Sequence, residues 1–240
     1  MKKTFFAFAL IALMIFNQSC KQKGVASGVI VSKEIPVTEY SVISSALPAN
    51  IIYEQKDAPA YLKLDIDQSV LDKLDIVVKD SVLQLNLKSG VSLNLKTDKW
   101  VVRTNSKSLK LISLTSAGNF NLKNLSGVKR LDVRLEGAGN FEAENLDCVS
   151  FALTISGAGN AKVKGKAEAA AYNLSGVGNM EAEEFDVKSL RVFLSGVGNA
   201  KVNAADYLYV GLKGAGNVEY KAKPKNLETD IQGVGKVKQL

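Results

Sequence analysis

Gly176-Val177-Gly178-Asn179 is one of seven similar tetrapeptides that recur along the second half of the chain. The series begins at Ser116-Ala117-Gly118-Asn119 and ends at Gly233-Val234-Gly235-Lys236, and its final residues are spaced by 21, 20, 19, 20, 18 and 19 residues. A regular period near twenty residues is typical of a solenoid, in which each copy forms one coil. The repeat therefore predicts the architecture and says little about activity.

Alternating apolar residues flank each tetrapeptide. Val192 and Leu194 precede Asn199 with period two, and Ala200 and Val202 follow it in the same way. This alternation is typical of strands with one buried face. Two strands per copy favour a parallel β-helix over a leucine-rich repeat, in which the rest of each copy is a helix or a loop. We expect an all-β solenoid with about 20 residues per coil, preceded by a less regular β half.

The glycines and asparagines of the repeat are interpreted as structural turns. Glycine allows backbone conformations that a sharp corner requires, and asparagine tolerates the left-handed region. Stacked asparagines can also hydrogen-bond to one another. A phosphate-binding loop would need a helix start and usually a lysine. The predicted turn residues are Gly118, Asn119, Gly137, Gly139, Asn140, Gly157, Gly159, Asn160, Gly176, Gly178, Asn179, Gly196, Gly198, Asn199, Gly214, Gly216 and Asn217.

Residues 1–19 have the pattern of a signal peptide. Lys2 and Lys3 form a charged start, residues 4–16 are an apolar run, and Ser19 precedes Cys20. Asn17-Gln18-Ser19-Cys20 resembles the lipobox of bacterial lipoproteins, although Phe16 or Asn17 stands where leucine is usual. The resemblance implies lipidation of Cys20; the alternative is an ordinary secretory site with an unmodified cysteine. We expect an exported protein anchored to the cell envelope, at the outer membrane, with the periplasmic or surface face left open.

The rest of the chain divides into three parts. Residues 20–34 are predicted to be a flexible tether, residues 35–110 a β-rich half or cap, and residues 111–240 the repeat β-helix. Whether the β-rich half continues the solenoid stays open. Asp67 is a candidate N-cap for one short helical turn. Strands are expected at residues 37–43, 51–54, 61–66, 74–78, 82–87, 91–95 and 100–104.

Charges alternate in sign from coil to coil on the strand that follows each turn. One row runs Asn121, Glu142, Lys162, Glu181, Lys201, Glu219 and Lys238, and a second begins Lys123, Glu144, Lys164 and Glu183. In a parallel, in-register stack these side chains are neighbours, so opposite charges would pair across coils. An exposed pair contributes only about 0–1 kcal/mol. We therefore interpret the rows as register devices rather than acid–base pairs or metal ligands.

Few residues are suited to catalysis. The chain contains no histidine, and Cys148 lies in an apolar context with nothing nearby to activate it, so a buried structural thiol is expected. We expect no catalytic residue, no metal, no cofactor and no enzymatic activity. Arg191, Phe193 and Tyr209 lie on outward positions and form a candidate binding face for a glycan or an envelope protein. The alternative is that these are scattered surface aromatics.

The serial turns from Asn119 to Asn217, with the lead-in at residues 100–114, resemble the head GIN domain family of bacterial lipoproteins and secreted proteins. The resemblance implies a right-handed β-helix related in shape to pectin lyases, with no recognised catalytic set and a proposed adhesive role. Lys236 departs from the asparagine pattern at the last turn. We expect a non-enzymatic, lipid-anchored module with no nucleic-acid partner and an oligomeric state left open. The alternative is a polysaccharide lyase or hydrolase, which would need clustered carboxylates in a groove.

Overall fold

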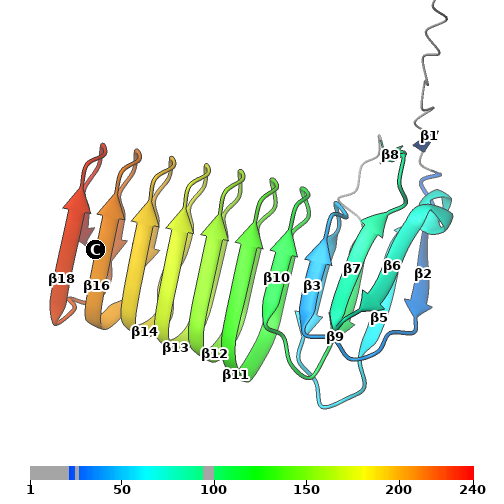
Figure 1. The fold of residues 1–240 in the computed structure, drawn as a ribbon, viewed down its shortest axis with the longest axis horizontal. Coiled ribbons are helices and arrows are strands. Elements are labelled where there is room, and N and C mark those ends of the chain that lie inside the picture. Colours follow the sequence, from blue (N-terminus) through cyan, green and yellow to red (C-terminus); the bar gives the residue numbers. More distant parts are fainter. Residues whose placement is uncertain (1–21, 25–26, 94–99) are drawn as a thin grey trace, which may run out of the picture.

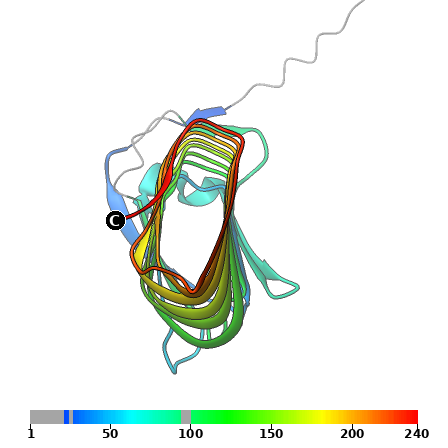
Figure 2. The same ribbon diagram turned by 90° about the vertical axis from the view of Figure 1, so that its left-hand side faces the viewer.

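The computed structural model describes residues 22–24, 27–93 and 100–240. Most of these residues belong to one 17-stranded sheet that winds into a rod (Figure 1). Viewed along the rod, the coils superpose into a single flattened outline (Figure 2). Leu135 pairs with Ile155, and Ile155 pairs with Leu174. Equivalent positions of successive repeats therefore lie side by side, so each repeat forms one coil. The prediction of an all-β solenoid with about 20 residues per coil is confirmed.

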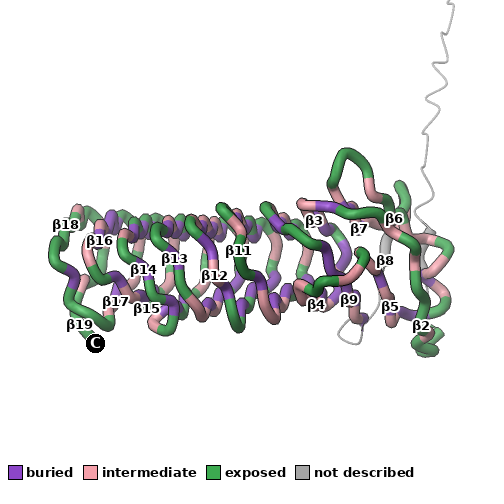
Figure 3. The backbone as a smooth tube through the Cα atoms, turned by 90° about the horizontal axis from the view of Figure 1, so that it is seen from below, coloured by how far each residue is buried: buried purple, intermediate pink, exposed green. Residues whose placement is uncertain are grey.

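In the first four coils of the repeat half, a single long strand bends around the corner between one turn and the next, and in the later coils the strand is divided in two at the corner. Equivalent positions pair in parallel from coil to coil, as Phe120 does with Phe141 and Phe141 with Ala161. Inward positions are apolar and buried, and they line the inside of the rod along its length (Figure 3). The strands are β11 (Phe120–Leu135), β12 (Phe141–Ile155), β13 (Ala161–Leu174), β14 (Met180–Leu194), β15 (Ala200–Val202), β16 (Ala204–Leu212), β17 (Val218–Tyr220), β18 (Asn226–Ile231) and β19 (Val237–Gln239).

The N-terminal half continues the solenoid. Its principal strands are β3 (Val42–Ser45), β4 (Asn50–Glu54), β7 (Val82–Leu87), β9 (Val101–Asn105) and β10 (Leu111–Leu114). On one side, β3 pairs in parallel with β10 and β4 with β11; on the other side, β3 pairs with β7 and β4 with β9. The coil formed by β3 and β4 is therefore inserted between two coils that follow it in the sequence.

Antiparallel strands cover the N-terminal end of the rod. Strand β6 (Leu74–Lys79) pairs with β7, while β5 (Tyr61–Asp67) pairs with β9 and β2 (Ile30–Ile35) pairs with β5. The antiparallel strands end the stack of coils at this end of the rod. Without them, the first parallel coil would expose a row of unpaired backbone groups to which strands of another molecule could bind.

A short 3₁₀ helix, η1 (Gln68–Lys73), follows β5 and confirms the predicted helical turn. The Asp67 carboxylate accepts hydrogen bonds from the backbone N–H of Ser69 at 2.9 Å and of Gly28 at 2.9 Å. Ser27 and Ser69 also donate their hydroxyl groups to it. These bonds, chiefly that from the Ser69 hydroxyl, hold the pKa of Asp67 well below its usual range. Asp67 thus joins η1 to the segment that leads into β2.

The structure differs from the sequence predictions near the N-terminus. Residues 30–34 of the predicted tether belong to β2, because Val31 lies opposite buried Ile66 in the pairing with β5. Strand β1 (Gln22–Gly24), also in that segment, pairs with β8 (Val91–Leu93). The strand expected at residues 37–43 begins only at Val42. Residues 94–95 of another expected strand, the signal peptide and Cys20 lie outside the described residues.

Candidate functional site

The asparagines of the repeat form a ladder along one edge of the rod. Each side-chain carbonyl accepts a bond from the backbone N–H of the next asparagine; from Asn140 to Asn160 this distance is 3.0 Å. The next amide group donates to the same oxygen, as Asn160 Nδ2 does at 3.1 Å. The ladder begins at Asn50, which accepts from Asn119 Nδ2 at 2.8 Å, and ends at Lys236, whose N–H donates to Asn217 at 3.1 Å. Through these hydrogen bonds, the asparagine side chains of the turns hold adjacent coils together.

The repeat glycines are required by the close approach of one turn to the next. A Cβ atom on Gly159 would lie 2.0 Å from the carbonyl oxygen of Gly139, and one on Gly137 would lie 2.0 Å from that of Ser116. Side chains cannot occupy that space without moving the neighbouring backbone. The turns are thus built for stacking and leave no room for a ligand between them.

The two charge rows pair across coils on the exposed face. Lys238 lies 2.9 Å from Glu219, and Lys123 forms an ion pair with Glu144. The hydrogen bond from Lys123 lowers the pKa of Glu144. In the second row, Lys164 pairs with Glu184 at 2.8 Å rather than with the expected Glu183. The reason is a register shift, which places one extra residue of β14 opposite β13 after Lys162.

The described residues show no convergent reactive group. Burial raises the pKa of the Cys148 thiol to about 12, so the thiol stays protonated at neutral pH. The carboxylates of the rows alternate with lysines and lie on an open face. Within the described ranges, no cluster of three or more metal-ligating acidic or cysteine side chains is present. Residues 22–24, 27–93 and 100–240 also contain no helix of the length and apolar character needed to cross a bilayer.

The structure brings Arg191, Phe193 and Tyr209 together on the outer face of β14 and β16. Arg191 pairs with Tyr209 in the parallel register, and the Phe193 and Tyr209 ring centroids are 5.4 Å apart. Phe193 is 42% exposed. Gly211 lies opposite Phe193, and a Cβ there would come within 3.1 Å of the Phe193 ring, so the glycine leaves room for the ring to lie over the next coil. We call these three side chains the aromatic patch.

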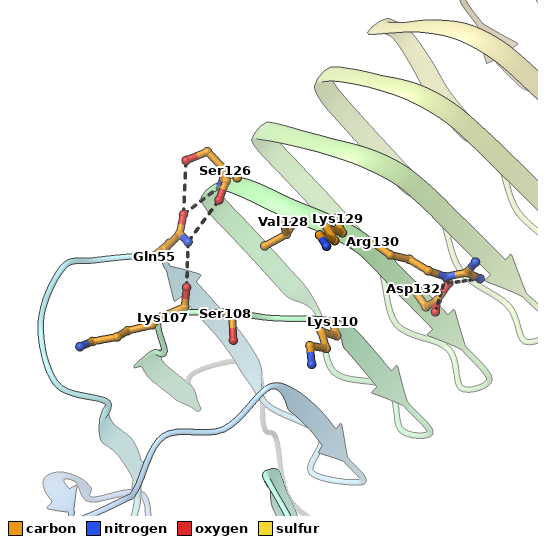
Figure 4. Close-up of a pocket in the computed structure, with 10 residues that line it drawn as sticks. Gln55, Lys107, Ser108, Lys110, Ser126, Val128, Lys129, Arg130 and Asp132 are labelled. Carbon is orange, nitrogen blue, oxygen red and sulfur yellow. Dashed lines mark hydrogen bonds and ion pairs between the residues drawn. The ribbon is translucent and has the colours of Figure 1, made fainter.

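A second feature, a basic cleft, lies where the N-terminal coils meet the first repeat coil (Figure 4). Its volume is about 480 Å³. The chain leaves the rod after β4, at Gln55, and residues 106–110 later lead back into the rod at β10. The corner of β11 therefore has no continuous strand beside it on its N-terminal side, and the cleft forms there. The lining residues are Gln55, Lys107, Ser108, Lys110, Ser126, Gly127, Val128, Lys129, Arg130 and Asp132.

Hydrogen bonds fix the walls of the basic cleft. Gln55 Nε2 donates to the carbonyl of Lys107 at 3.0 Å, and Gln55 Oε1 accepts from the Ser126 N–H at 2.9 Å. The buried Tyr53 hydroxyl donates to the Ser106 carbonyl at 2.7 Å, and Glu39 accepts from the Lys107 N–H at 3.1 Å. The backbone of the cleft is therefore held in place from three separate segments.

The basic cleft could not be recognised from the repeat pattern. Its residues come from the end of β4, the segment before β10 and the corner of β11, which are far apart in the sequence. The one available signal is the cluster of cations in Lys107, Lys110, Lys129 and Arg130, on both sides of the predicted boundary at residue 110. The repeat period and the alternation of apolar residues predict strands, and they give no information about a place where a coil is interrupted.

The fold is a β-solenoid that carries the aromatic patch and the basic cleft on the outside of the rod. A family model described as "Putative auto-transporter adhesin, head GIN domain" matches residues 39–224. This chain belongs to that family, because the match covers well over half of its length. No curated protein matches the chain.

Solved structures share the whole fold. A crystal structure described as "a putative adhesin" from Bacteroides fragilis NCTC 9343 is 26% identical, with a TM-score of 0.84, and the match covers 91% of this chain and 99% of that chain. A "putative adhesin" from Parabacteroides distasonis ATCC 8503 is 26% identical, with a TM-score of 0.67 and coverage of 91% and 99%. A "Putative lipid binding protein" from the same strain is 22% identical, with a TM-score of 0.73 and coverage of 91% and 100%, and shows the fold alone.

Proposed function

We propose that this protein is a non-enzymatic module of the cell envelope, anchored by a lipid on Cys20, that binds a glycan or an envelope protein through the outer face of its solenoid. The observation that carries the binding role is the aromatic patch. Phe193 and Tyr209 contact each other on a rigid sheet, with Arg191 beside them. Phe193 is exposed and Tyr209 is half-buried, and aromatic and arginine side chains are those that most often dominate binding energies at interfaces.

Family membership supports this proposal, because the family is described in terms of adhesion. The same β-helical shape can also host polysaccharide lyases and hydrolases, so fold alone does not decide between binding and catalysis. The distribution of charge favours binding. Glycoside cleavage requires two carboxyl groups converging on one bond, whereas Glu144 and Glu184 are each paired with a lysine of an adjacent coil.

The binding role is tested by truncating the patch. We expect the double variant Phe193→Ala with Tyr209→Ala to lose at least about tenfold in affinity on an array of glycans and envelope proteins, since a lost hot spot costs about 1.4 kcal/mol or more. Val197→Ala is the matched control, because Val197 is 56% exposed on a turn away from the patch. Equal binding by the double variant and the control would exclude the patch as the recognition surface.

The anchor is tested by labelling cells with a fatty-acid precursor. We expect Cys20→Ala to abolish lipid labelling and to release the protein from the membrane fraction, since a thioether or thioester to lipid requires that sulfur. Cys148→Ala is the control, because Cys148 is buried and should leave labelling unchanged. Labelling that persists in Cys20→Ala contradicts the anchor.

A further inference from the structure

We propose that the basic cleft is a binding site for an acidic saccharide, meaning a sugar segment that carries carboxylate, phosphate or sulfate groups. The site lies on the same side of the rod as the aromatic patch but three coils away from it, since Asp132 of the cleft and Arg191 of the patch belong to one row of paired positions. The proposal extends the proposed binding function without depending on the patch.

The cleft carries an excess of positive charge. Lys107, Lys110, Lys129 and Arg130 line it together with a single carboxylate, Asp132. Arg130 Nη2 lies 2.9 Å from Asp132 Oδ1, and the hydrogen bond to this carboxylate raises the pKa of the guanidinium. None of the three lysine ammonium groups has a carboxylate within 4.0 Å in the described part of the chain, although the Glu39 carboxylate accepts a hydrogen bond from the backbone N–H of Lys107. Positive charges that line one cleft repel each other, so an anion from solution would stabilise the arrangement.

The corresponding corners of later coils do not share this excess. Lys166 lies 3.3 Å from Asp147, Lys188 lies 2.6 Å from Glu168, and Lys225 lies 2.7 Å from Asp206. A depression of about 370 Å³ at these corners is therefore lined by both signs of charge. Lys166, Lys188 and Lys225 are thus each neutralised by a carboxylate of an adjacent coil, whereas the lysine ammonium groups at the interrupted corner are not.

The positions of the side chains suit an anionic ligand with several groups. In Figure 4, Lys110 and Lys129 lie on different segments, with Val128 next to Lys129 on the corner of β11, while Lys107 extends outward along its own segment. Lysine ammonium groups on flexible stems act as point charges and accept anions of varied geometry. Ser108 and Ser126 place hydroxyl groups on the wall, and the fixed backbone limits the ordering cost of binding.

The volume and the charge of the cleft favour an anionic saccharide over a single ion. At about 480 Å³, the cleft falls in the range of about 300–1,000 Å³ that is typical of small organic ligands, so a lone phosphate would leave it mostly empty. Val128 is the only aliphatic hydrophobic side chain among the lining residues, and the rest of the apolar wall comes from the methylene stems of the lysines and Arg130, against which the C–H face of a sugar ring can pack. Carboxylated or sulfated sugars combine hydroxyl groups with charge and match both features.

The proposal is tested with the full-length protein in detergent and four probes: a galacturonic acid tetramer, a neutral galactose tetramer, inorganic phosphate, and vesicles of phosphatidylcholine with phosphatidylglycerol. We expect the charged tetramer to bind, with an affinity that falls as salt rises, and the neutral tetramer not to bind. Lys110→Gln with Lys129→Gln should weaken binding of the charged tetramer about tenfold, given up to about fivefold for each exposed charge pair.

Lys213→Gln is the matched control, since it removes the same charge from an exposed lysine at the Gly-x-Gly-Asn edge and should change binding less than about twofold. The patch variant Phe193→Ala with Tyr209→Ala should keep binding to the charged tetramer, which separates this site from the proposed recognition surface. The proposal is overturned if both tetramers bind equally, if the double lysine variant binds like the control, or if only phosphate or vesicles bind.

Discussion

Gly159→Ala is expected to lower the free energy of unfolding by about 3 kcal/mol or more. The new Cβ would lie 2.0 Å from the Gly139 carbonyl oxygen, which belongs to the backbone of the adjacent turn and cannot rotate away. To make room, the two coils would have to separate at the asparagine ladder, where Asn160 bonds to Asn140. Urea unfolding followed by circular dichroism measures the effect.

Gly127→Ala provides the control for this substitution. Gly127 has a φ of +70°, which alanine adopts at a cost of about 1–2 kcal/mol, but nothing lies within 4 Å of the position of its Cβ. The comparison separates backbone conformation from close approach. If Gly127→Ala were as destabilising as Gly159→Ala, the tight stacking of the turns would not be the source of their glycine requirement.

Phe151→Ala is expected to destabilise the rod by about 3–5 kcal/mol, a large fraction of the stability of a typical domain. Phe151 is fully buried, and its ring lies 5.5 Å from that of Phe185 and 6.1 Å from that of Tyr172, centroid to centroid. These rings come from three successive coils, so the truncation opens a cavity that no single coil can close. The unfolding midpoint in urea and the thermal midpoint should both fall.

Phe193→Ala is the matched control, because it makes the same truncation on the same kind of strand at a side chain that is 42% exposed. We expect a change within about 1 kcal/mol. A loss at Phe193 as large as that at Phe151 would mean that Phe193 supports the fold, and its assignment to a binding face would have to be withdrawn.

Much of the fold could be predicted from the spacing of the repeat, because each Gly-x-Gly-Asn turn requires the same close stacking. The start of the asparagine ladder could not be predicted in this way. Asn50 follows Leu47-Pro48-Ala49, which contains no glycine, and yet it bonds to Asn119 like a repeat asparagine. The insertion of the β3–β4 coil between later coils could not be predicted either, because the alternation of apolar and polar residues indicates a strand but not the strand with which it pairs.

Register and site were only partly predictable. The charge rows were predicted by counting residues from each turn. This count is wrong by one residue in β14, because an extra residue there places Glu184, and not Glu183, beside Lys164. Arg191, Phe193 and Tyr209 could be grouped from the alignment of copies, since parallel in-register stacking places equivalent positions side by side. The basic cleft depends on an interruption of the pattern, which no pattern-based argument can locate.

The central claim is that this solenoid binds ligands on its outer surface without changing them. The most direct measurement is the length distribution of an acidic polysaccharide, such as polygalacturonate, after incubation with the full-length protein under conditions in which the two associate. Our account predicts binding with an unchanged distribution and no new chain ends. Shortened products that disappear when the exposed carboxylates Glu142 and Glu181 are replaced by glutamine would contradict it.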